Sequence, residues 1–176
     1  MKKLFFTTVT ICLLTFTGQS QVSATLNGGV FLSPDIEETF LGANLALKYD
    51  LTDDMRAGLS LGWYNYSEGD SDFKVGISYM PISALYEYRF LHGAFRPYAG
   101  INAGLYMTSV RVSFLGESDS DSVTDFGFAP VIGTDYAISD SFGINFNAKY
   151  HFILDGDDEY ENTTAIAINL GVTYSF

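Results

Sequence analysis

Apolar and polar residues alternate with a period of two along most of this chain, and this pattern limits it to half-buried β-strands. Successive side chains of a strand point to opposite faces, so each alternating segment has one apolar face and one small or polar face. Residues 163–176 show the pattern most clearly. Their apolar face carries Ile166, Ile168, Leu170, Val172, Tyr174 and Phe176. Their other face carries Ala165, Ala167, Asn169, Gly171, Thr173 and Ser175.

Eight segments of this kind follow one another, and we interpret each as a strand. The apolar positions change phase after Pro81 in the fourth segment and after Met107 in the fifth, and a proline at such a change predicts a β-bulge. Short turns at one rim and longer loops at the other are typical of an up-and-down β-barrel. The short connections are 50–54, 91–95 and 139–141. The longer, polar connections are 33–39, 67–72, 116–122 and 155–162.

The composition of the two faces indicates which one points outward. The polar face is rich in Gly, Ala, Ser and Asn, as a barrel lumen requires, and the apolar face is broad and aromatic. Aromatic residues make up 16% of the chain and charged residues only 17%, against about a quarter in soluble domains. A soluble, lipocalin-like barrel would bury the apolar face instead, and alternation alone leaves that alternative open. We expect an all-β fold, an eight-stranded antiparallel up-and-down transmembrane β-barrel, because closure satisfies every backbone polar group in lipid.

The first 24 residues are typical of a cleaved signal peptide. Lys2 and Lys3 precede the apolar stretch 4–16, and small residues follow at candidate cleavage sites after Ser20 and after Ala24. A stretch of 13 residues, with threonines among the apolar ones, is too short for a helix across a hydrocarbon core of about 30 Å. We therefore expect residues 1–24 to be the signal peptide and 25–176 the barrel domain. The single cysteine, Cys12, leaves with the signal, so neither a disulfide nor a cysteine metal cluster is expected.

The C-terminal segment 169–176 resembles the β-signal of outer-membrane proteins, which the barrel assembly machinery reads. The matching positions are Asn169, Gly171, Tyr174 and Phe176. Residues 95–104 resemble the Pro-Tyr-x-Gly-x-Gly strand common in small eight-stranded outer-membrane β-barrels of the OmpA/OmpX-like group, and 49–52 resembles their first periplasmic turn. The resemblance covers about residues 25–176 and specifies the fold better than the activity.

This resemblance implies a location in the outer membrane of a Gram-negative bacterium, with both termini in the periplasm. The implied partners are outer-membrane lipid, lipopolysaccharide and the barrel assembly machinery, and we expect a monomer. A net charge of −12 excludes nonspecific nucleic-acid binding through a basic surface.

Strand parity predicts a charge network inside the barrel. A lumen-facing charge needs a partner, because an unpaired buried charge costs several kcal/mol. Two interpretations follow: a plug of salt bridges, or a gate whose pairs rearrange to pass small ions. The interior of eight strands is just filled by side chains, which favours the plug. The predicted lumen charges are Lys48, Arg56, Lys74, Glu87, Arg89, Arg111, Asp125, Asp135 and Lys149. The predicted polar partners are Asn44, Tyr64, Tyr98, Asn102 and Asn147.

The four longer connections hold 14 of the 21 acidic residues. A solvated rim explains such a distribution, and weak divalent-cation binding by carboxylate oxygens is the functional alternative. Residues 155–159 lack the ligand spacing of an EF-hand. The acids are Asp35, Glu37, Glu38, Glu68, Asp70, Asp72, Glu117, Asp119, Asp121, Asp155, Asp157, Asp158, Glu159 and Glu161.

Catalytic groups are sparse in this sequence. Only His92 and His151 are present, and Ile153 occupies the position where the His-x-Ser pattern of lipid A deacylases has serine. A nucleophile, a base and an orienting acid must come together for such chemistry, and no cofactor or metal motif is present. We therefore expect a non-enzymatic envelope protein with a structural or surface-binding role through its acidic extracellular loops. A narrow ion pore (a small porin) is the alternative, and a lipid A-modifying enzyme is a distant one.

Overall fold

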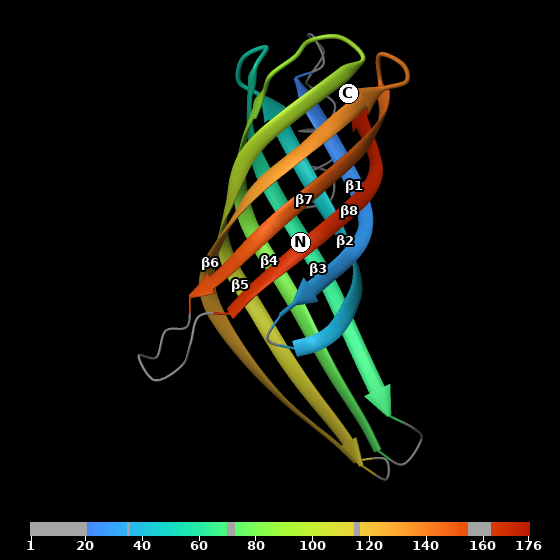
Figure 1. Cartoon of the computed structure of the whole chain (residues 1–176), viewed down its shortest axis with the longest axis vertical. Coiled ribbons are helices and arrows are strands. Elements are labelled where there is room, and N and C mark those ends of the chain that lie inside the picture. Colours follow the sequence, from blue (N-terminus) through green and yellow to red (C-terminus); the bar gives the residue numbers. More distant parts are fainter. Residues whose placement is uncertain (1–20, 35, 70–72, 115–116, 155–162) are drawn as a thin grey trace, which may run out of the picture.

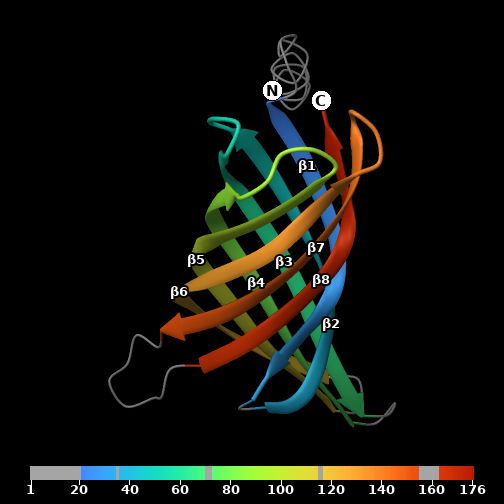
Figure 2. The same cartoon turned by 45° about the horizontal axis from the view of Figure 1, so that its top comes forward.

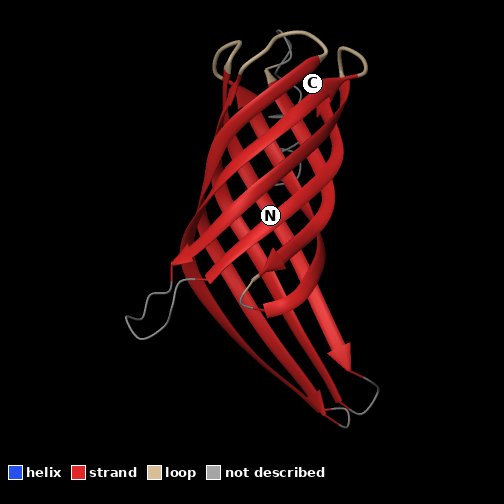
Figure 3. Ribbon diagram, viewed as in Figure 1, coloured by secondary structure: helices blue, strands red, loops and turns tan. Residues whose placement is uncertain are grey.

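Eight antiparallel strands form a closed barrel in the computed structural model, which describes residues 21–34, 36–69, 73–114, 117–154 and 163–176 (Figures 1 and 3). Each strand pairs with its neighbours in the chain, and β1 pairs with β8 to close the sheet. The strands are β1 (Val22–Ser33), β2 (Ile36–Asp50), β3 (Met55–Gly69), β4 (Phe73–Arg89), β5 (Phe95–Phe114), β6 (Glu117–Ala137), β7 (Phe142–Leu154) and β8 (Thr163–Ser175). The expected eight-stranded antiparallel barrel is confirmed.

In the described part of the chain, no helix is long and apolar enough to span a bilayer.

The start of β1 and the end of β8 lie at the same rim as the three short connections (Figures 1 and 2). Backbone hydrogen bonds tie these ends together: Phe176 N donates to Val22 O at 3.0 Å and Ser175 N to Ser141 O at 2.9 Å. We call this rim the terminal rim, and the opposite rim the loop rim. The strand ends that flank the longer connections of the sequence analysis all lie at the loop rim.

Outward-facing side chains form an apolar belt, as the alternation predicts. Leu41, Leu59 and Ile132 are each 66% exposed, although they are aliphatic. Aromatic side chains surround the terminal rim, which is the position of an interfacial girdle in a membrane barrel. The exposed aromatics there are Tyr49, Tyr88, Phe90, Phe95, Tyr136, Phe142, Tyr174 and Phe176. The inward face is buried and polar, so the soluble alternative, with its apolar face inside, does not describe this barrel.

Strands β3 to β6 project beyond the other strands at the loop rim (Figure 1). The projection exists because β5 and β6 stay paired from Phe95↔Tyr136 to Phe114↔Glu117. Ser33 and the segments 36–39, 67–69 and 117–122, which the sequence analysis expected in loops, are strand. Ladder hydrogen bonds satisfy the backbone whatever the side chains are, so a polar sequence such as Ser118–Ser122 can extend a strand into water.

The structure contradicts the expected bulge at Pro81. The pairing of β4 with β5 runs without a shift from Phe73↔Phe114 to Arg89↔Tyr98, with Pro81 opposite Tyr106. The phase change of the apolar residues in the sequence has a different cause. Ile77 and Tyr79 pack inside the barrel, so apolar residues move to the inner face where the strand leaves the belt. The register does shift between Leu32 and Ser33, in the tight β1–β2 connection that was expected as a longer loop.

Candidate functional site

The lumen near the terminal rim holds six of the nine predicted inward charges. These six are at most 8% exposed: Lys48, Arg56, Glu87, Arg89, Asp135 and Lys149. Asp125 is half-buried and pairs in register with the buried Tyr106, so it lies on the inner face nearer the loop rim. Lys74 and Arg111 are exposed, and the prediction that they face the lumen is wrong. The prediction assigned strand faces on the assumption that apolar residues point outward along the whole strand. This assumption is wrong beyond the apolar belt.

Glu87 and Asp135 are the anionic centres of the network. Lys48 Nζ lies 3.1 Å from Glu87 Oε2, and Arg56 Nε donates to the same oxygen. Arg56 Nη1 reaches Asp135 Oδ2 at 2.6 Å, so one guanidinium joins two carboxylates. Charge-assisted hydrogen bonds of this kind are the strong ones in proteins, and the low dielectric of the interior strengthens them. The cluster links β2, β3, β4 and β6 through the middle of the barrel.

A chain of amide hydrogen bonds extends this cluster across the lumen. Asn145 Nδ2 donates to Asp135 Oδ1 at 2.7 Å, and its Oδ1 accepts from Asn147 Nδ2 at 2.7 Å. Asn147 Oδ1 accepts from Asn169 Nδ2 at 3.1 Å, and Asn169 Oδ1 accepts from Tyr64 Oη at 2.9 Å. Each amide therefore donates on one side and accepts on the other, which satisfies buried polar atoms without water.

Of the predicted polar partners, Tyr64 and Asn147 belong to this amide chain. Asn44 Nδ2 donates to Ser60 Oγ at 2.8 Å, and Asn102 Nδ2 donates to Ser83 Oγ at 3.3 Å. The sequence analysis did not include Asn145, and it placed Asn169 only in the assembly signal. Both residues lie on the small, polar face of their segments in the sequence, and this position could have identified them as lumen residues.

Tyrosine rings fill the remaining space beside glycines on neighbouring strands. Tyr98 pairs with Gly133, and a Cβ built on Gly133 would come within 2.6 Å of the phenol oxygen. Arg56 Cζ lies 4.6 Å and Lys48 Nζ 5.1 Å from the centroid of the same ring, which gives Tyr98 two cation–π contacts. The glycines of the polar face therefore make room for aromatic rings that pack against the charges.

A second, aromatic layer closes the lumen toward the loop rim. Phe31 stacks on Tyr79 with ring centroids 5.0 Å apart and lies 5.2 Å from the ring of Tyr64. Phe40 packs edge-on against Tyr79, at 5.1 Å between centroids. Tyr106 completes the layer and forms a 2.7 Å hydrogen bond with His151 Nδ1. All of these rings are buried, so the layer and the charge cluster together fill the barrel.

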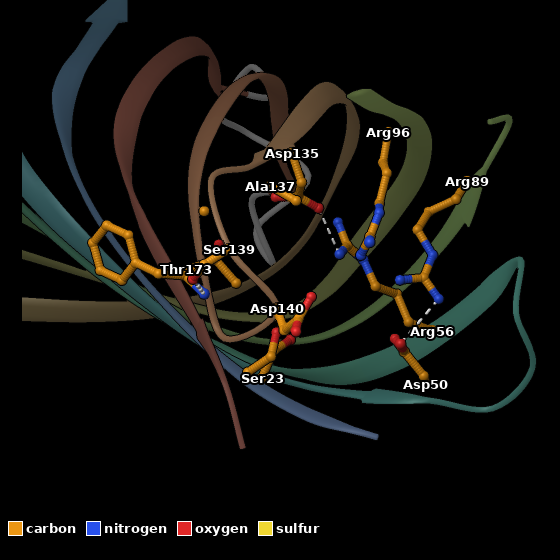
Figure 4. Close-up of a pocket in the computed structure, with 13 residues that line it drawn as sticks. Ser23, Asp50, Arg56, Arg89, Arg96, Asp135, Ala137, Ser139, Asp140 and Thr173 are labelled. Atoms are coloured by element: carbon orange, nitrogen blue, oxygen red, sulfur yellow. Dashed lines mark hydrogen bonds and ion pairs between the residues drawn. The ribbon is translucent and has the colours of Figure 1, made fainter. Parts of the chain in front are cut away.

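A cavity of about 260 Å³ opens at the terminal rim, between this rim and the charge cluster (Figure 4). Arg56 and Asp135 form its inner wall, and Arg89, paired with Asp50 at 3.0 Å between Nη2 and Oδ2, lies nearer its mouth. Arg96 and Asp140 also line it. The buried ion pair of Arg56 with Asp135 is thus part of the cavity lining.

Lys149 differs from the other lumen cations. It is 7% exposed, and within the described residues no carboxylate lies within ion-pair distance of its ammonium. Its hydrogen-bond acceptor is Asn44 Oδ1, at a long 3.5 Å. Arg56 Nη2 and Arg89 Nε are also buried without a hydrogen-bond partner. Asp135 Oδ2 also lacks a hydrogen bond, although it lies 2.6 Å from Arg56 Nη1 as an ion pair, so the lumen holds both donors and acceptors that are not hydrogen-bonded.

The two histidines lie apart and in different surroundings. His92 is exposed at the terminal rim, where its Nε2 lies 2.9 Å from Asp54 Oδ1. His151 is buried against Tyr106 and Phe31. Among the described residues, no three His, Cys, Asp or Glu side chains are grouped as metal ligands.

The residues of the expected assembly signal occupy both faces of β8. Asn169 and Gly171 face the lumen side, where Gly171 lies against the backbone of Asn27. Tyr174 and Phe176 are about half exposed on the outer surface, with ring centroids 5.1 Å apart. Recognition of this strand by the assembly machinery stays a prediction.

An apolar, aromatic exterior around a closed antiparallel barrel with a polar and charged interior defines the class of outer-membrane β-barrels. Residues 8–176 match the family model described as the outer membrane protein beta-barrel domain, and the chain belongs to this family. The protein is accordingly a bacterial outer-membrane protein.

Known proteins of similar sequence or fold agree with this assignment. An uncharacterized outer-membrane protein of Sinorhizobium fredii is 34% identical over 116 residues, which cover 62% of this chain and about half, 50%, of that relative. Among solved structures, Neisserial surface protein A has a TM-score of 0.63 at 21% identity, covering 88% of this chain and 96% of that one. Ail, the attachment invasion locus protein of Yersinia pestis, has a TM-score of 0.63 at 17% identity with the same coverage. At these identities the structures show the shared fold alone.

Proposed function

We propose that this protein is a non-enzymatic envelope protein whose barrel is a closed scaffold for a surface-exposed loop rim. The observation that carries the proposal is the filled lumen. The Arg56–Glu87–Asp135 cluster and the aromatic layer around Phe31 occupy the interior with hydrogen-bonded or tightly packed groups. A scaffold of this kind needs no continuous water path and no reactive group in the lumen.

The surface-binding part of the proposal rests on the loop rim. The described acids Glu68, Asp119 and Asp121 lie on the projecting parts of β3 and β6. Asp35, Asp70, Asp72 and the five acids between 155 and 161 lie outside the described residues, as do the side chains of Glu37 and Glu117. An acidic rim favours cationic partners and weak binding of Ca²⁺ or Mg²⁺ through carboxylate oxygens. The fold relative Ail has been crystallised with the heparin analogue sucrose octasulfate, a polyanion. The acidic rim proposed here would repel such a ligand.

Single-channel recording in a planar lipid bilayer tests the closed scaffold. Purified, folded protein is expected to give no discrete conductance steps between about −100 and +100 mV, because side chains fill an eight-stranded interior. Reproducible steps from the unmodified protein would contradict the proposal. Variants that open the lumen, such as Arg56→Ala with Glu87→Ala, provide a positive control for insertion.

A narrow, gated ion pore is the second candidate, and the cavity at the terminal rim favours it. That cavity reaches the Arg56–Asp135 pair, where buried Arg56 Nη2 has no partner. A gate predicts rare openings in the unmodified protein that become frequent in Asp135→Asn, since this change weakens the blocking pair. The closed scaffold predicts that Asp135→Asn lowers stability and leaves the bilayer silent.

Mass spectrometry of lipid A addresses the enzyme alternative. Lipid A from cells with and without the protein is expected to be identical in acyl composition. The buried position of His151 supports this expectation, because substrate acyl chains would have to displace Phe31 and Tyr106 to reach the imidazole. A change in acylation that disappears in His151→Gln would favour an enzyme.

A further inference from the structure

The outer surface of the projecting strands has a sharp boundary between apolar and polar residues. Leu61, Ile82, Leu105 and Phe126 are paired in register across β3, β4, β5 and β6, and each is 44–53% exposed on the outer face. Four residues farther along the strands, the outward-facing row is polar: Asn65, Ser78, Ser109 and Ser122, again paired in register. Between the two rows lie Trp63, which is 62% exposed, and Met80, Met107 and Thr124.

This boundary marks the outer edge of the apolar belt. Side chains on one face of a strand are about 7 Å apart along it, so the polar row begins one step beyond Trp63. Tryptophan prefers the interface between hydrocarbon and head groups, because its ring is apolar and its indole N–H is polar. Residues on this face beyond the polar row therefore lie at the depth of the outer-leaflet head groups.

The two basic residues that parity counting misplaced lie at this depth. The next outward row contains Ser67, Gly76, Arg111 and Ser120, and the row after it contains Gly69, Lys74, Ser113 and Ser118. Arg111 is directly opposite Gly76 and Lys74 directly opposite Ser113. Lys74 and Arg111 are thus diagonal neighbours on adjacent strands, about 7–8 Å apart at Cα, which lets two long side chains converge on one group.

Charge is separated between the two faces of the projection. The residues that continue the inner face include three acids, Glu68, Asp119 and Asp121. Their partners in register are Val75, Val112 and Val110, respectively. The outer rows just described contain Lys74 and Arg111 and no acidic residue. Neither cation has an ion-pair partner within the described residues. Among the described residues this part of the outer face is therefore basic, which is complementary to an anion.

A hollow of about 340 Å³ lies between these side chains and Trp63. Its lining includes Lys74, Arg111, Ser67 and Ser78, and Gly76 leaves its floor open. A Cβ built on Gly76 would have its nearest neighbours, Tyr66 O and Ser67 Cβ, at 3.7 and 4.0 Å, so the position of this missing side chain is open. Two cations, several hydroxyl donors and an indole edge surround a volume large enough for a phosphorylated sugar.

We propose that this hollow binds the phosphate-bearing sugar of an outer-leaflet glycolipid, such as the lipid A part of lipopolysaccharide. Lys74 and Arg111 bind the phosphate, the serines donate to phosphate or sugar oxygens, and Trp63 packs where the head group meets the acyl chains. The acyl chains then lie on the Leu61–Ile82–Leu105–Phe126 row. This site needs no bridging cation and is independent of whether the lumen is closed.

Tryptophan fluorescence provides a direct test, because Trp63 is the single tryptophan of the chain. The full-length barrel, folded in neutral detergent, is titrated with bis-phosphorylated lipid A, with the same lipid A after phosphatase treatment, and with inorganic phosphate. We expect saturable change in Trp63 emission with the phosphorylated lipid. Binding is expected to weaken at least about tenfold when the phosphates are removed, because charge-assisted hydrogen bonds are lost.

Variants separate a specific site from general lipid adsorption. Lys74→Gln with Arg111→Gln is expected to weaken binding of phosphorylated lipid A at least about tenfold. Asp53→Asn, in an exposed turn of the terminal rim, is expected to leave it unchanged, and heat-modifiable electrophoretic mobility verifies folding of both variants. Equal affinity for phosphorylated and phosphate-free lipid, or an unaffected double variant, would overturn the proposal. Displacement of the lipid by millimolar inorganic phosphate would also overturn it, since the site would then recognise the free anion.

Discussion

Arg56 on β3 and Asp135 on β6 form a 2.6 Å ion pair, although their strands are not neighbours in the sheet. The pair therefore crosses the interior and connects two strands that the backbone ladder does not, whereas Glu87 on β4 lies directly opposite Arg56 in the ladder. Both residues are buried, Arg56 at 3% and Asp135 at 8% exposure. Breaking one member of such a cluster costs more than the net value of the contact, because it leaves uncompensated charge in a low dielectric.

Glu87→Gln is expected to lower the free energy of unfolding by about 3–5 kcal/mol, because Lys48 and Arg56 lose their shared counter-charge. Urea unfolding in lipid vesicles, followed by Trp63 emission and by gel mobility, measures the change. Glu68→Gln, in the projection outside the lumen, is the control and is expected to change stability by less than about 0.5 kcal/mol. Equal midpoints for the two variants would show that the cluster does not stabilise the barrel.

Gly133→Ala is expected to destabilise the barrel by about 1–3 kcal/mol through overpacking. The new methyl group would meet Phe146 O and the ring of Tyr98, both 2.6 Å from its position. Gly28→Ala is the matched control, because its methyl group would have its nearest neighbour, Gly42 O, at 3.9 Å. Combining Gly133→Ala with Tyr98→Ala should remove much of the penalty. Similar losses for Gly133→Ala and Gly28→Ala would argue against ring packing as the cause.

The two lumen lysines should respond in opposite directions to substitution by methionine. Lys149→Met is expected to leave stability unchanged or raise it by about 1 kcal/mol, because a buried ammonium without a carboxylate partner costs desolvation energy. Lys48→Met is expected to lower stability by about 1–3 kcal/mol, since the hydrogen bond from its ammonium to Glu87 is lost. Paired urea titrations give the sign directly. A strong loss in Lys149→Met would indicate an anionic partner for this lysine in the membrane.

Signal cleavage is expected after Ser20 rather than after Ala24. Gln21 and Val22 already participate in the barrel: Asp50 N donates to Gln21 O at 2.7 Å and Phe176 N to Val22 O at 3.0 Å. Cleavage after Ala24 would remove these bonds and shorten β1 by three residues. Intact-mass spectrometry of protein purified from membranes decides between the two. A mature chain beginning at Thr25 would show that the start of β1 is dispensable.

Much of the lumen could be predicted by counting along strands, because side-chain direction alternates strictly between the two faces. Six of the nine charges predicted for the lumen are buried there. The partners were less predictable. The hydrogen bond from Tyr64 to Asn169 and the pair of Arg56 with Asp135 join residues 105 and 79 positions apart. Such contacts depend on the closure of the sheet and on the stagger of its strands. Neither property can be derived from the period-two pattern of the sequence.

The sequence by itself determined the eight strands, the apolar belt, the rim at which the short turns lie and the family of the barrel. These properties follow from local alternation and from the requirement that every backbone polar group in lipid be paired. Only the tertiary structure decided how far the strands extend beyond the belt and which face Lys74 and Arg111 occupy. Beyond the belt the outer face no longer contacts hydrocarbon, and its residues need not be apolar. The hydrophobicity of a residue there does not indicate which face of the strand it occupies. The continuous β4–β5 register then places these two basic residues outside.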